Sequence, residues 1–344
     1  MKTRMMLALA VLALAALLTA GCGKQAVVNV YNWGDYMDPA VLEAFEKETK
    51  IKVIYDVYST NEELLAKLKA GGTNYDVVIP STNMLEVFLA QDLISELDLG
   101  KIPNFKNLDP QFTDLVSDPG NKYSVPYFWG TIGILYNAKT IGSDIDSWRA
   151  MFDPKYSGKI IMFDSVRDTI GVTLKMLGYS LNSTDPEQLA EVERLLIEQK
   201  ELIHSYTVDA YEDPLLAGDA WLSMAWSGDA FKVIAENPDF KYVIPKEGTN
   251  VWVDSMAIPK SAKNKDAAYK FIDFILKPEI GAQLAQYLGY STPNKEAQAL
   301  LPEGVRDNPV IYPTGNVFEM NDVQVDIKEA TELYDRIWTE IKSN

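Results

Sequence analysis

Large aromatic side chains and carboxylates recur together in this chain of 344 residues. In the stretch GTNVWVDSMAIP, Trp252 and Asp254 lie two residues apart between valines. If this stretch is a β-strand, both side chains project from one face, because side chains alternate across a strand. Further aromatic and acidic residues stand at the ends of other predicted elements: Trp33, Asp35 and Tyr36 in YNWGDY, Trp226 and Asp229 in MAWSGDAF, and Tyr290 in LGYSTPN.

Such a combination of side chains suits a ligand with an apolar middle and cationic ends. An ammonium group over an aromatic ring gains about 0.5–2 kcal/mol, and a carboxylate adds a charge-assisted hydrogen bond. Stacked rings also cover an apolar chain, which gains roughly 0.8 kcal/mol per buried methylene. The pattern therefore predicts a site for a diamine or polyamine. Polar residues at two more element ends join the candidates: Ser81 and Asn83 in PSTN, and Ser165 and Asp168 in FDSVRDTI.

Each of these features also has an ordinary structural explanation. A single Trp at the end of a strand is most often a core residue. Asp35 follows a glycine, a position typical of a turn or a helix cap. Asp168 is an acid in the first turn of a predicted helix, where the helix dipole favours it. The interpretation as a ligand site therefore depends on the repetition of the pattern at several element ends.

Strand-like and helix-like segments alternate along the first part of the chain. A β-branched stretch at 27–33 precedes a predicted helix at 38–49, which has start signals at its beginning. Strands at 51–58 and 75–82, with a helix at 59–71 between them, continue the alternation. This β-α-β-α-β order predicts a largely parallel sheet.

A second α/β set is expected after an extended segment at 122–137, and the stretch at 251–259 crosses back. The predicted fold class is therefore α/β with two lobes, each a mixed sheet flanked by helices, joined by extended crossings. Ligands of such folds lie beyond the carboxyl ends of the strands. The expected division is a first lobe of 22–131 with about 255–300, a second lobe of 132–251 with about 301–344, and hinge crossings near 131 and 252.

Residues 1–21 are predicted to be a secretory signal peptide, with two positive charges followed by an apolar run. The run is shorter than the roughly 20 residues of a spanning helix. The sequence LTAGC resembles a bacterial lipobox, which predicts lipidation of Cys22 after cleavage, although Thr19 stands where Leu is more usual. The alternative is ordinary cleavage nearby with a free Cys22. We expect a domain outside the cytoplasmic membrane, in the periplasm or on the membrane's outer face, tethered by lipid.

Composition excludes several classes of protein. Cys22 is the only cysteine and His204 the only histidine, so disulfides, Cys–His or Ser–His catalytic pairs and His-rich metal sites are not expected. The net charge of −17 becomes more negative when the leader is removed, which disfavours nucleic acid and favours cations. Many exported proteins are acidic for solubility alone. No cofactor, metal or nucleic-acid partner is expected, and the GxxxxGK[ST], GxSxG and HExxH motifs are absent.

Several long segments resemble the spermidine/putrescine-binding proteins of bacterial ABC importers. The resemblance covers nearly the whole chain from about residue 27, in the same order. It rests on YNWGDYMDPAVLEAFEKETKIKVIYDVYSTNEELLAKL, YDVVIPST, YSVPYFWGTIGILYN, MLGYSLNSTDP, WSGDAF, PKEGTNVWVDSMAIPKSAKNKDAA and LGYSTPN.

The resemblance implies a periplasmic binding protein with a Venus-flytrap, type II-like fold, which closes on a polyamine and delivers it to the permease subunits of an ABC transporter. It also implies that Asp254 holds an amine, that Ser81 makes a polar contact and that Asp168 stands where the family has a Glu. Asp35 and Asp229 match acids of the putrescine-preferring members. The implied aromatic residues are Trp33, Tyr36, Trp226, Trp252 and Tyr290.

Three positions depart from the pattern of the spermidine-preferring members. Ser165 stands where they have a further Asp, Met320 where they have a Gln, and Asn83 where they have a Tyr. These changes remove polar contacts expected for spermidine, so the resemblance favours putrescine first with spermidine also admitted.

Other functions remain as alternatives. Carboxylates and aromatic residues also occur together in glycoside hydrolases, which need two carboxyls about 5–9.5 Å apart, but nothing in the sequence fixes such a pair. Binding proteins for another cationic amine or for a sugar use similar rings, although sugar sites usually contain many amide and Arg donors. The same fold also serves as a ligand-sensing partner of membrane receptors. The residues favour a binding protein rather than an enzyme, and a monomer is the usual state of the proteins that the chain resembles.

Overall fold

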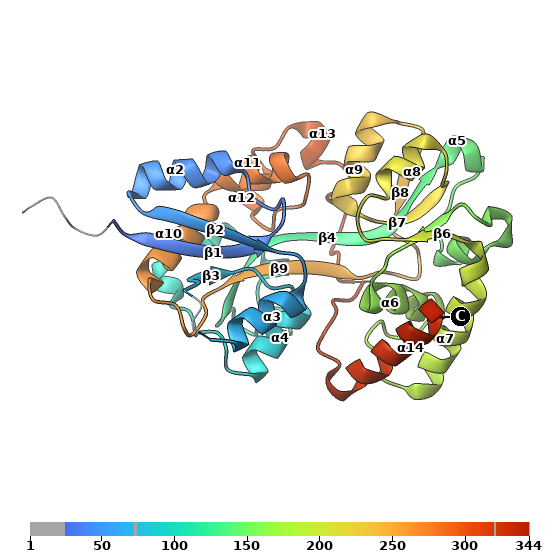
Figure 1. Cartoon of the computed structure of the whole chain (residues 1–344). Helices are drawn as coiled ribbons and strands as arrows, with labels where there is room; N and C mark the ends of the chain where they lie inside the picture. Colours follow the sequence, from blue (N-terminus) through green and yellow to red (C-terminus); the bar gives the residue numbers. More distant parts are fainter. Residues whose placement is uncertain (1–24, 72–73, 320, 344) are drawn as a thin grey trace, which may run out of the picture.

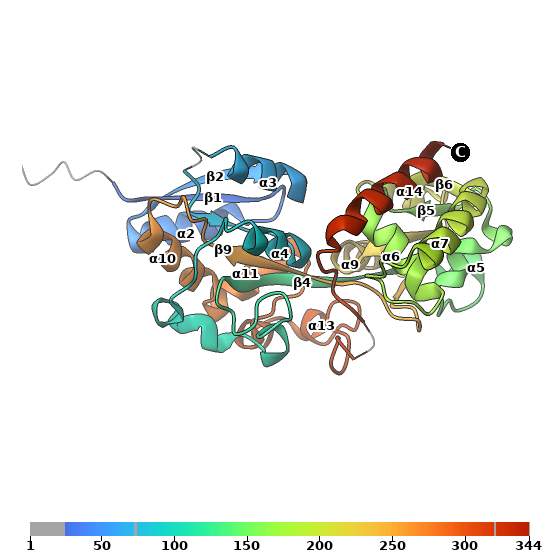
Figure 2. The same cartoon turned by 90° about the horizontal axis from the view of Figure 1, so that it is seen from below.

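The computed structural model describes residues 25–71, 74–319 and 321–343, which fold into two α/β lobes joined by long strands (Figure 1). The strands β4 (Ser124–Asn137) and β9 (Val251–Ala257) run from one lobe into the other. Both views show this crossing, with the first lobe on the left (Figure 2). The expected two-lobed α/β architecture is confirmed.

The sheet of the first lobe has the strand order β2-β1-β3-β9-β4. In it, β1 (Val27–Trp33) pairs in parallel with β2 (Lys52–Tyr58) and with β3 (Val77–Val78). The returning strand β9 pairs antiparallel with both β3 and β4. The sheet is therefore mixed, because the parallel β-α-β part meets strands that come back from the second lobe.

Local signals define the helices that connect these parallel strands. The helix α2 (Pro39–Thr49) begins with Pro at its first position, and the side chain of Asp38 accepts a hydrogen bond from the amide of Ala40. The next helix, α3 (Asn61–Lys69), is capped by Thr60. Such caps satisfy amides that have no partner within the helix. The first lobe is completed by α4 (Thr82–Ala90), α10 (Lys265–Ile275), α11 (Pro278–Leu288), α12 (Lys295–Gln298) and α13 (Glu303–Arg306).

The sheet of the second lobe continues from β4 through β7 (Leu222–Trp226) and β5 (Ile160–Met162) to β6 (Ile203–Tyr206). The short strand β8 (Phe240–Val243) pairs with β4 as well. This sheet is also mixed, since β5 is parallel to β6 and β7 whereas β7 is antiparallel to β4. Its helices are α5 (Ala138–Ile141), α6 (Val166–Met176), α7 (Pro186–Gln199), α8 (Glu212–Ala217), α9 (Ser227–Glu236) and α14 (Thr331–Ser343).

Each lobe has its own large hydrophobic core, and the side chain of Trp252 packs against both. The packing of the C-terminal part differs from the expected division at 301. Leu301, Ile311 and Val317 belong to the core of the first lobe, whereas α14 packs against α6 and α7 of the second. Most apolar side chains of 301–317 pack in the first core, although Val310 packs against the second, so we propose that the first lobe extends to about residue 317.

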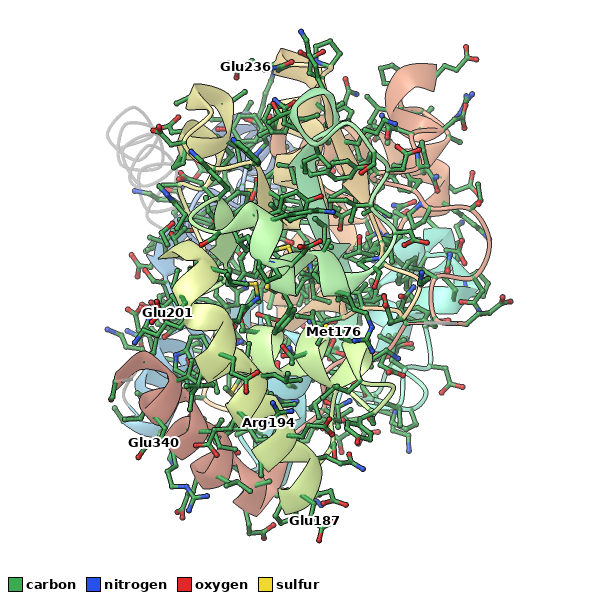
Figure 3. All side chains as sticks on the ribbon, turned by 90° about the vertical axis from the view of Figure 1, so that its right-hand side faces the viewer. Met176, Glu187, Arg194, Glu201, Glu236 and Glu340 are labelled. Atoms are coloured by element: carbon green, nitrogen blue, oxygen red, sulfur yellow. The ribbon has the colours of Figure 1, made fainter. Side chains whose placement is uncertain are left out.

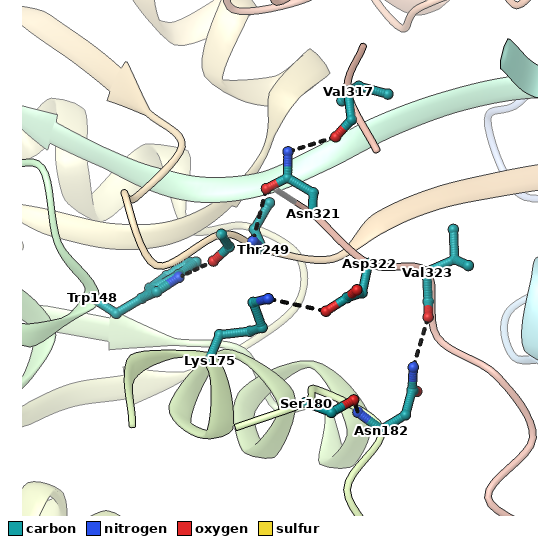
Figure 4. A network of polar contacts seen from close by, with 10 residues as sticks. Trp148, Lys175, Ser180, Asn182, Thr249, Val317, Asn321, Asp322 and Val323 are labelled. Carbon is teal, nitrogen blue, oxygen red and sulfur yellow. Dashed lines mark hydrogen bonds and ion pairs between the residues drawn. The ribbon is translucent and has the colours of Figure 1, made fainter. Parts of the chain in front are cut away.

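A third passage between the lobes follows that point, and Figure 4 shows how it is fixed. The side chain of Asn321 accepts from the Thr249 amide at 3.0 Å and donates to the Val317 carbonyl at 2.7 Å. Lys175 forms an ion pair with Asp322 at 3.0 Å. Residues 321–325 are thereby held beside the beginning of β9.

The outer end of the second lobe carries many carboxylates (Figure 3). The exposed side chains of Glu187, Glu201, Glu236 and Glu340 lie around the rim of the second lobe in this view. They contribute to the net charge of −17, which repels anionic polymers. Within the described ranges, no helix has both the length and the apolar composition to cross a membrane.

We predict that Phe45→Ala lowers the free energy of unfolding by about 3–5 kcal/mol, because the mutation leaves a cavity in the first core. The Phe45 ring is fully buried, with centroids 5.3 Å from Phe271 and 5.4 Å from Phe274. Urea unfolding would measure the loss. The matched control is Ile54→Ala at an exposed site, which should cost less than about 1 kcal/mol. Equal losses for both variants would contradict this account of the core.

Candidate ligand-binding site

Four of the predicted aromatic residues meet where the lobes join. The ring centroid of Trp252 lies 6.2 Å from that of Trp226 and 5.3 Å from that of Tyr290, and Tyr290 lies 6.0 Å from Tyr36. All three pairs are close to perpendicular. We call Tyr36, Trp226, Trp252 and Tyr290 the aromatic box. Its members come from the first lobe, the second lobe and the crossing strand β9.

Glycines in both lobes allow the rings of the box to lie against the backbone. A Cβ atom on Gly130 would lie 2.8 Å from Ser227 Oγ and would overlap the Trp252 ring. A Cβ atom on Gly228 would lie 2.5 Å from Tyr290 Cε1. Both distances are too short for packed atoms, so only glycine permits these close approaches. The contact between Gly228 and Tyr290 also joins the two lobes directly.

Residues alternate along β9 as the sequence predicts. Val251 and Val253 are fully buried in the first core, whereas the Trp252 side chain is half-buried and belongs to the box. Opposite them on β4, Gly130 pairs with Trp252 and Phe128 with Asp254. The pleat therefore places Trp252 and Asp254 on the same side of this strand.

Asp254 is a buried carboxyl group with no cationic partner among the described residues. It is only 8% exposed. Burial raises its pKa to about 7, and the neighbouring Tyr36 hydroxyl lowers it only in part. The Tyr36 hydroxyl itself makes no hydrogen bond of normal geometry. At neutral pH this group is poised between its acid and its carboxylate, and a bound cation would favour the carboxylate.

Asp229 supplies a second acid on the other side of the box. It lies in the first turn of α9, where its Oδ1 accepts from the Tyr290 hydroxyl at 3.3 Å and pairs with Lys232 at 3.4 Å. Its Oδ2 accepts from the Tyr211 hydroxyl at 3.0 Å. Tyr290 thus connects an acid of the second lobe to the box.

Tyr211 is a positioning residue that the sequence analysis missed. Its side chain is fully buried, and its hydroxyl donates to Asp229 and accepts from the Trp226 amide at 3.1 Å. The Tyr211 hydroxyl therefore holds both the Asp229 carboxylate and the backbone of Trp226. Tyr211 stands in an irregular stretch before α8, and no motif or periodicity marks it.

Asp168 lies at another part of the junction, in the first turn of α6. It is 9% exposed, and burial raises its pKa although its hydrogen bonds oppose that effect. Ser165 caps α6 and donates to Asp168 at 2.7 Å, Asn250 donates at 3.2 Å and Gln324 at 2.7 Å. Gln324 was also missed, because it lies in the irregular third passage. Met320, where the sequence analysis placed the matching position, lies outside the described residues.

The remaining first-lobe candidates lie at the ends of β1 and β3. Trp33 packs on Tyr58 with centroids 4.6 Å apart and donates its indole N–H to the Ile79 carbonyl at 2.9 Å. Burial raises the pKa of Tyr58, and so does the nearby charge of Asp254. Trp33 therefore packs on a ring that is close to this acid. Ser81 lies opposite Asp254 in an isolated β-bridge. Its hydroxyl oxygen accepts a hydrogen bond from the side-chain amide of Asn61 at 2.5 Å.

Two further candidates have no described hydrogen bond or ring contact with the box. Asn83 is half-buried on α4. Asp35 is exposed in a turn with a left-handed φ of 50°, and no described hydrogen bond or ring contact joins it to the box. Its position agrees with the turn explanation considered in the sequence analysis. Cys22 lies outside the described residues. Within the described part of the chain, no group of three or more His, Cys, Asp or Glu side chains is arranged to hold a metal ion.

The two-lobed fold is that of solute-binding proteins, and sequence comparison agrees. The family model described as bacterial extracellular solute-binding protein matches residues 40–312. The chain belongs to this family, which consists of solute-binding proteins rather than enzymes. The resemblance noted from the sequence is confirmed.

Named relatives align over nearly the full chain. The spermidine/putrescine-binding periplasmic protein of Escherichia coli is 37% identical over 318 residues, which cover 91% of this chain and 90% of that protein. The putrescine-binding periplasmic protein SpuD of Pseudomonas aeruginosa is 37% identical, with 92% of each covered. The crystal structure of the spermidine/putrescine ABC transporter substrate-binding protein PotD of Streptococcus pneumoniae superposes with a TM-score of 0.84 at 39% identity, covering 92% of this chain and 99% of that one.

We predict that Asp254→Asn stabilises the ligand-free protein at pH 8 by about 2–4 kcal/mol and has little effect at pH 4. The folded protein holds a proton on Asp254 that the unfolded chain loses near pH 4. The free energy of unfolding therefore falls as the pH rises from about 4 to 7, and the amide avoids this loss. Urea unfolding at both pH values tests the prediction. A gain of the same size at both would rule out titration as its cause.

We predict that Gly228→Ala displaces the Tyr290 ring and alters the near-UV circular dichroism of the box without unfolding the second lobe. The control is Gly171→Ala in α6, where the nearest atom to a new Cβ is 3.6 Å away, an ordinary contact. That variant should leave the spectrum unchanged. Identical spectra for both variants would mean that the approach of Tyr290 to Gly228 tolerates a methyl group.

Proposed function

We propose that this protein captures a polyamine between its lobes, outside the cytoplasm, and delivers it to an ABC permease. The observation that carries the proposal is Asp254, a buried carboxyl beside aromatic rings with no Lys or Arg paired to it among the described residues. An uncompensated buried carboxylate is costly, and a bound ammonium ion removes that cost.

The ligand chemistry follows from the walls of the site. The rings of Trp252 and Tyr290 offer faces to methylene groups and to an ammonium, and Asp229 offers a second carboxylate beyond Tyr290. A linear molecule with an ammonium at each end satisfies both acids. A neutral sugar would leave Asp254 without a cation, and a single amine would leave one acid unused.

We rank putrescine ahead of spermidine. A third ammonium would need a third acid, and Asp168 is the candidate nearest the third passage. Its carboxylate already accepts hydrogen bonds from Ser165, Asn250 and Gln324. Less is therefore gained when a ligand binds there than at Asp254. Relatives named for spermidine/putrescine and for putrescine alone both match this chain at 37% identity.

The proposal extends to how the protein works in the cell. Residues 1–21 act as an export signal, and lipid on Cys22 holds a monomer at the outer face of the membrane, beside the permease subunits. The crossings near 131 and 252 act as the hinge. Since β9 carries both Trp252 and Asp254, bending at this strand moves the site as the lobes close.

Titration calorimetry on protein beginning after Cys22, unfolded and refolded to remove bound ligand, tests the proposal. The panel is putrescine, cadaverine, spermidine and spermine, with glucose, maltose and arginine as controls. We predict that Asp254→Asn weakens diamine binding by about 1.5–3 kcal/mol, the range for hydrogen bonds to charged groups. Affinity should also fall by up to about tenfold per pH unit below pH 7, as Asp254 gains its proton.

The matched control is Asp146→Asn, an exposed acid paired with Lys246 in the second lobe. It removes the same charge at an exposed position outside the aromatic box and should leave the affinity unchanged. Tight binding of glucose or maltose with no binding of any amine would replace the proposal with a sugar-binding function. If the affinity for amines changes neither with Asp254→Asn nor with pH, the ligand does not bind at Asp254.

A further inference from the structure

One ammonium group of the protein already lies at the aromatic box. The helix α9 places Lys232 one turn after Asp229, so that the two side chains share a face. Lys232 Nζ lies 3.4 Å from Asp229 Oδ1 and 5.8 Å from the ring centroid of Tyr290. These are the two contacts, carboxylate and aromatic face, that an alkylammonium ligand would make.

The path of the lysine side chain depends on a glycine. Lys232 Cε lies 3.1 Å from the position that a Cβ on Gly289 would take, so the aliphatic stem passes close over that backbone. Gly289 ends α11 with a φ of +78° and is followed by Tyr290. The stem therefore reaches from the second lobe across to the first, and the ammonium comes to lie beside the box.

The two acids beside the aromatic box differ in whether the protein pairs them with a cation. Asp254 has no protein cation among its described contacts, whereas Asp229 is paired with Lys232. Asp229 Oδ1 already accepts from Tyr290 and from Lys232, and a carboxylate oxygen offers about two lone-pair directions. A ligand ammonium that approaches Oδ1 along the Tyr290 ring meets the position that Lys232 Nζ holds.

We infer that Lys232 is an internal competitor for the amine at Asp229 and limits the affinity for ligands with two cationic ends. This inference rests on the proposed function. The lysine balances the charge of Asp229 in the free protein, and the second ammonium of the ligand must displace it. The Lys232 side chain is 55% exposed against 18% for Asp229, so the released lysine can point into water.

The test compares Lys232→Met, which keeps the length of the stem and removes the charge, with Lys246→Met. Lys246 is an exposed lysine of the same lobe, paired with Asp146, so the control changes the net charge equally. Calorimetry with putrescine and spermidine should show about two- to fivefold tighter binding for Lys232→Met, the range for an exposed ion pair. Lys246→Met should change the affinity by less than about 1.5-fold.

A double-mutant cycle with Asp229→Asn identifies the group through which Lys232 acts. Asp229→Asn should weaken binding more in the Lys232→Met protein than in the unchanged protein, because the carboxylate is then free for the ligand. Unchanged or weaker binding for Lys232→Met, with a normal unfolding temperature, would overturn the inference while amine binding by the unchanged protein still supports the proposed function. If the unchanged protein binds no amine, the proposed function itself is wrong.

Discussion

The burial of the Asp254 carboxyl is the constraint on which the site depends. A charge in this position is costly, and the chain offers no described lysine or arginine to offset it. The surrounding groups are rings and a tyrosine hydroxyl rather than a full set of donors. The protein therefore keeps an unfavourable group in its free state, and the cationic ligand that we propose would relieve it. Stability of the free protein and affinity for the ligand are opposed at this one residue.

The strand that carries Asp254 also joins the two lobes. Trp252 packs against both hydrophobic cores, and its ring contacts Trp226 of the second lobe and Tyr290 of the first. Tyr290 in turn bonds Asp229 and lies against Gly228 across the junction. The ligand site that we propose and the relative position of the lobes thus depend on the same side chains. Any movement of one lobe changes the distance between the two acids that a diamine would bridge.

The sequence predicted those parts of the site that follow from short periodic patterns. The alternation around Trp252 and Asp254 and the first-turn positions of Asp168 and Asp229 depend only on strand and helix geometry. Tyr211 and Gln324 were not predicted, because each stands in irregular chain. The pairing of Lys232 with Asp229 follows helical spacing, but the approach of Lys232 to the Tyr290 ring crosses the junction and has no local signal. The same limit explains the apolar residues of 301–317. The short helix α13 and the irregular chain after it carry no signal that distinguishes one lobe from the other, and only the packing of the cores does.

Within the residues that the structure describes, the backbone passes between the lobes three times, through β4, through β9 and through residues 321–325. The core of the first lobe therefore combines residues from Val28 onward with residues as late as Val317. A growing chain cannot complete that core until nearly all of it has been made. A protein with this order of segments therefore lacks its first core during most of its synthesis.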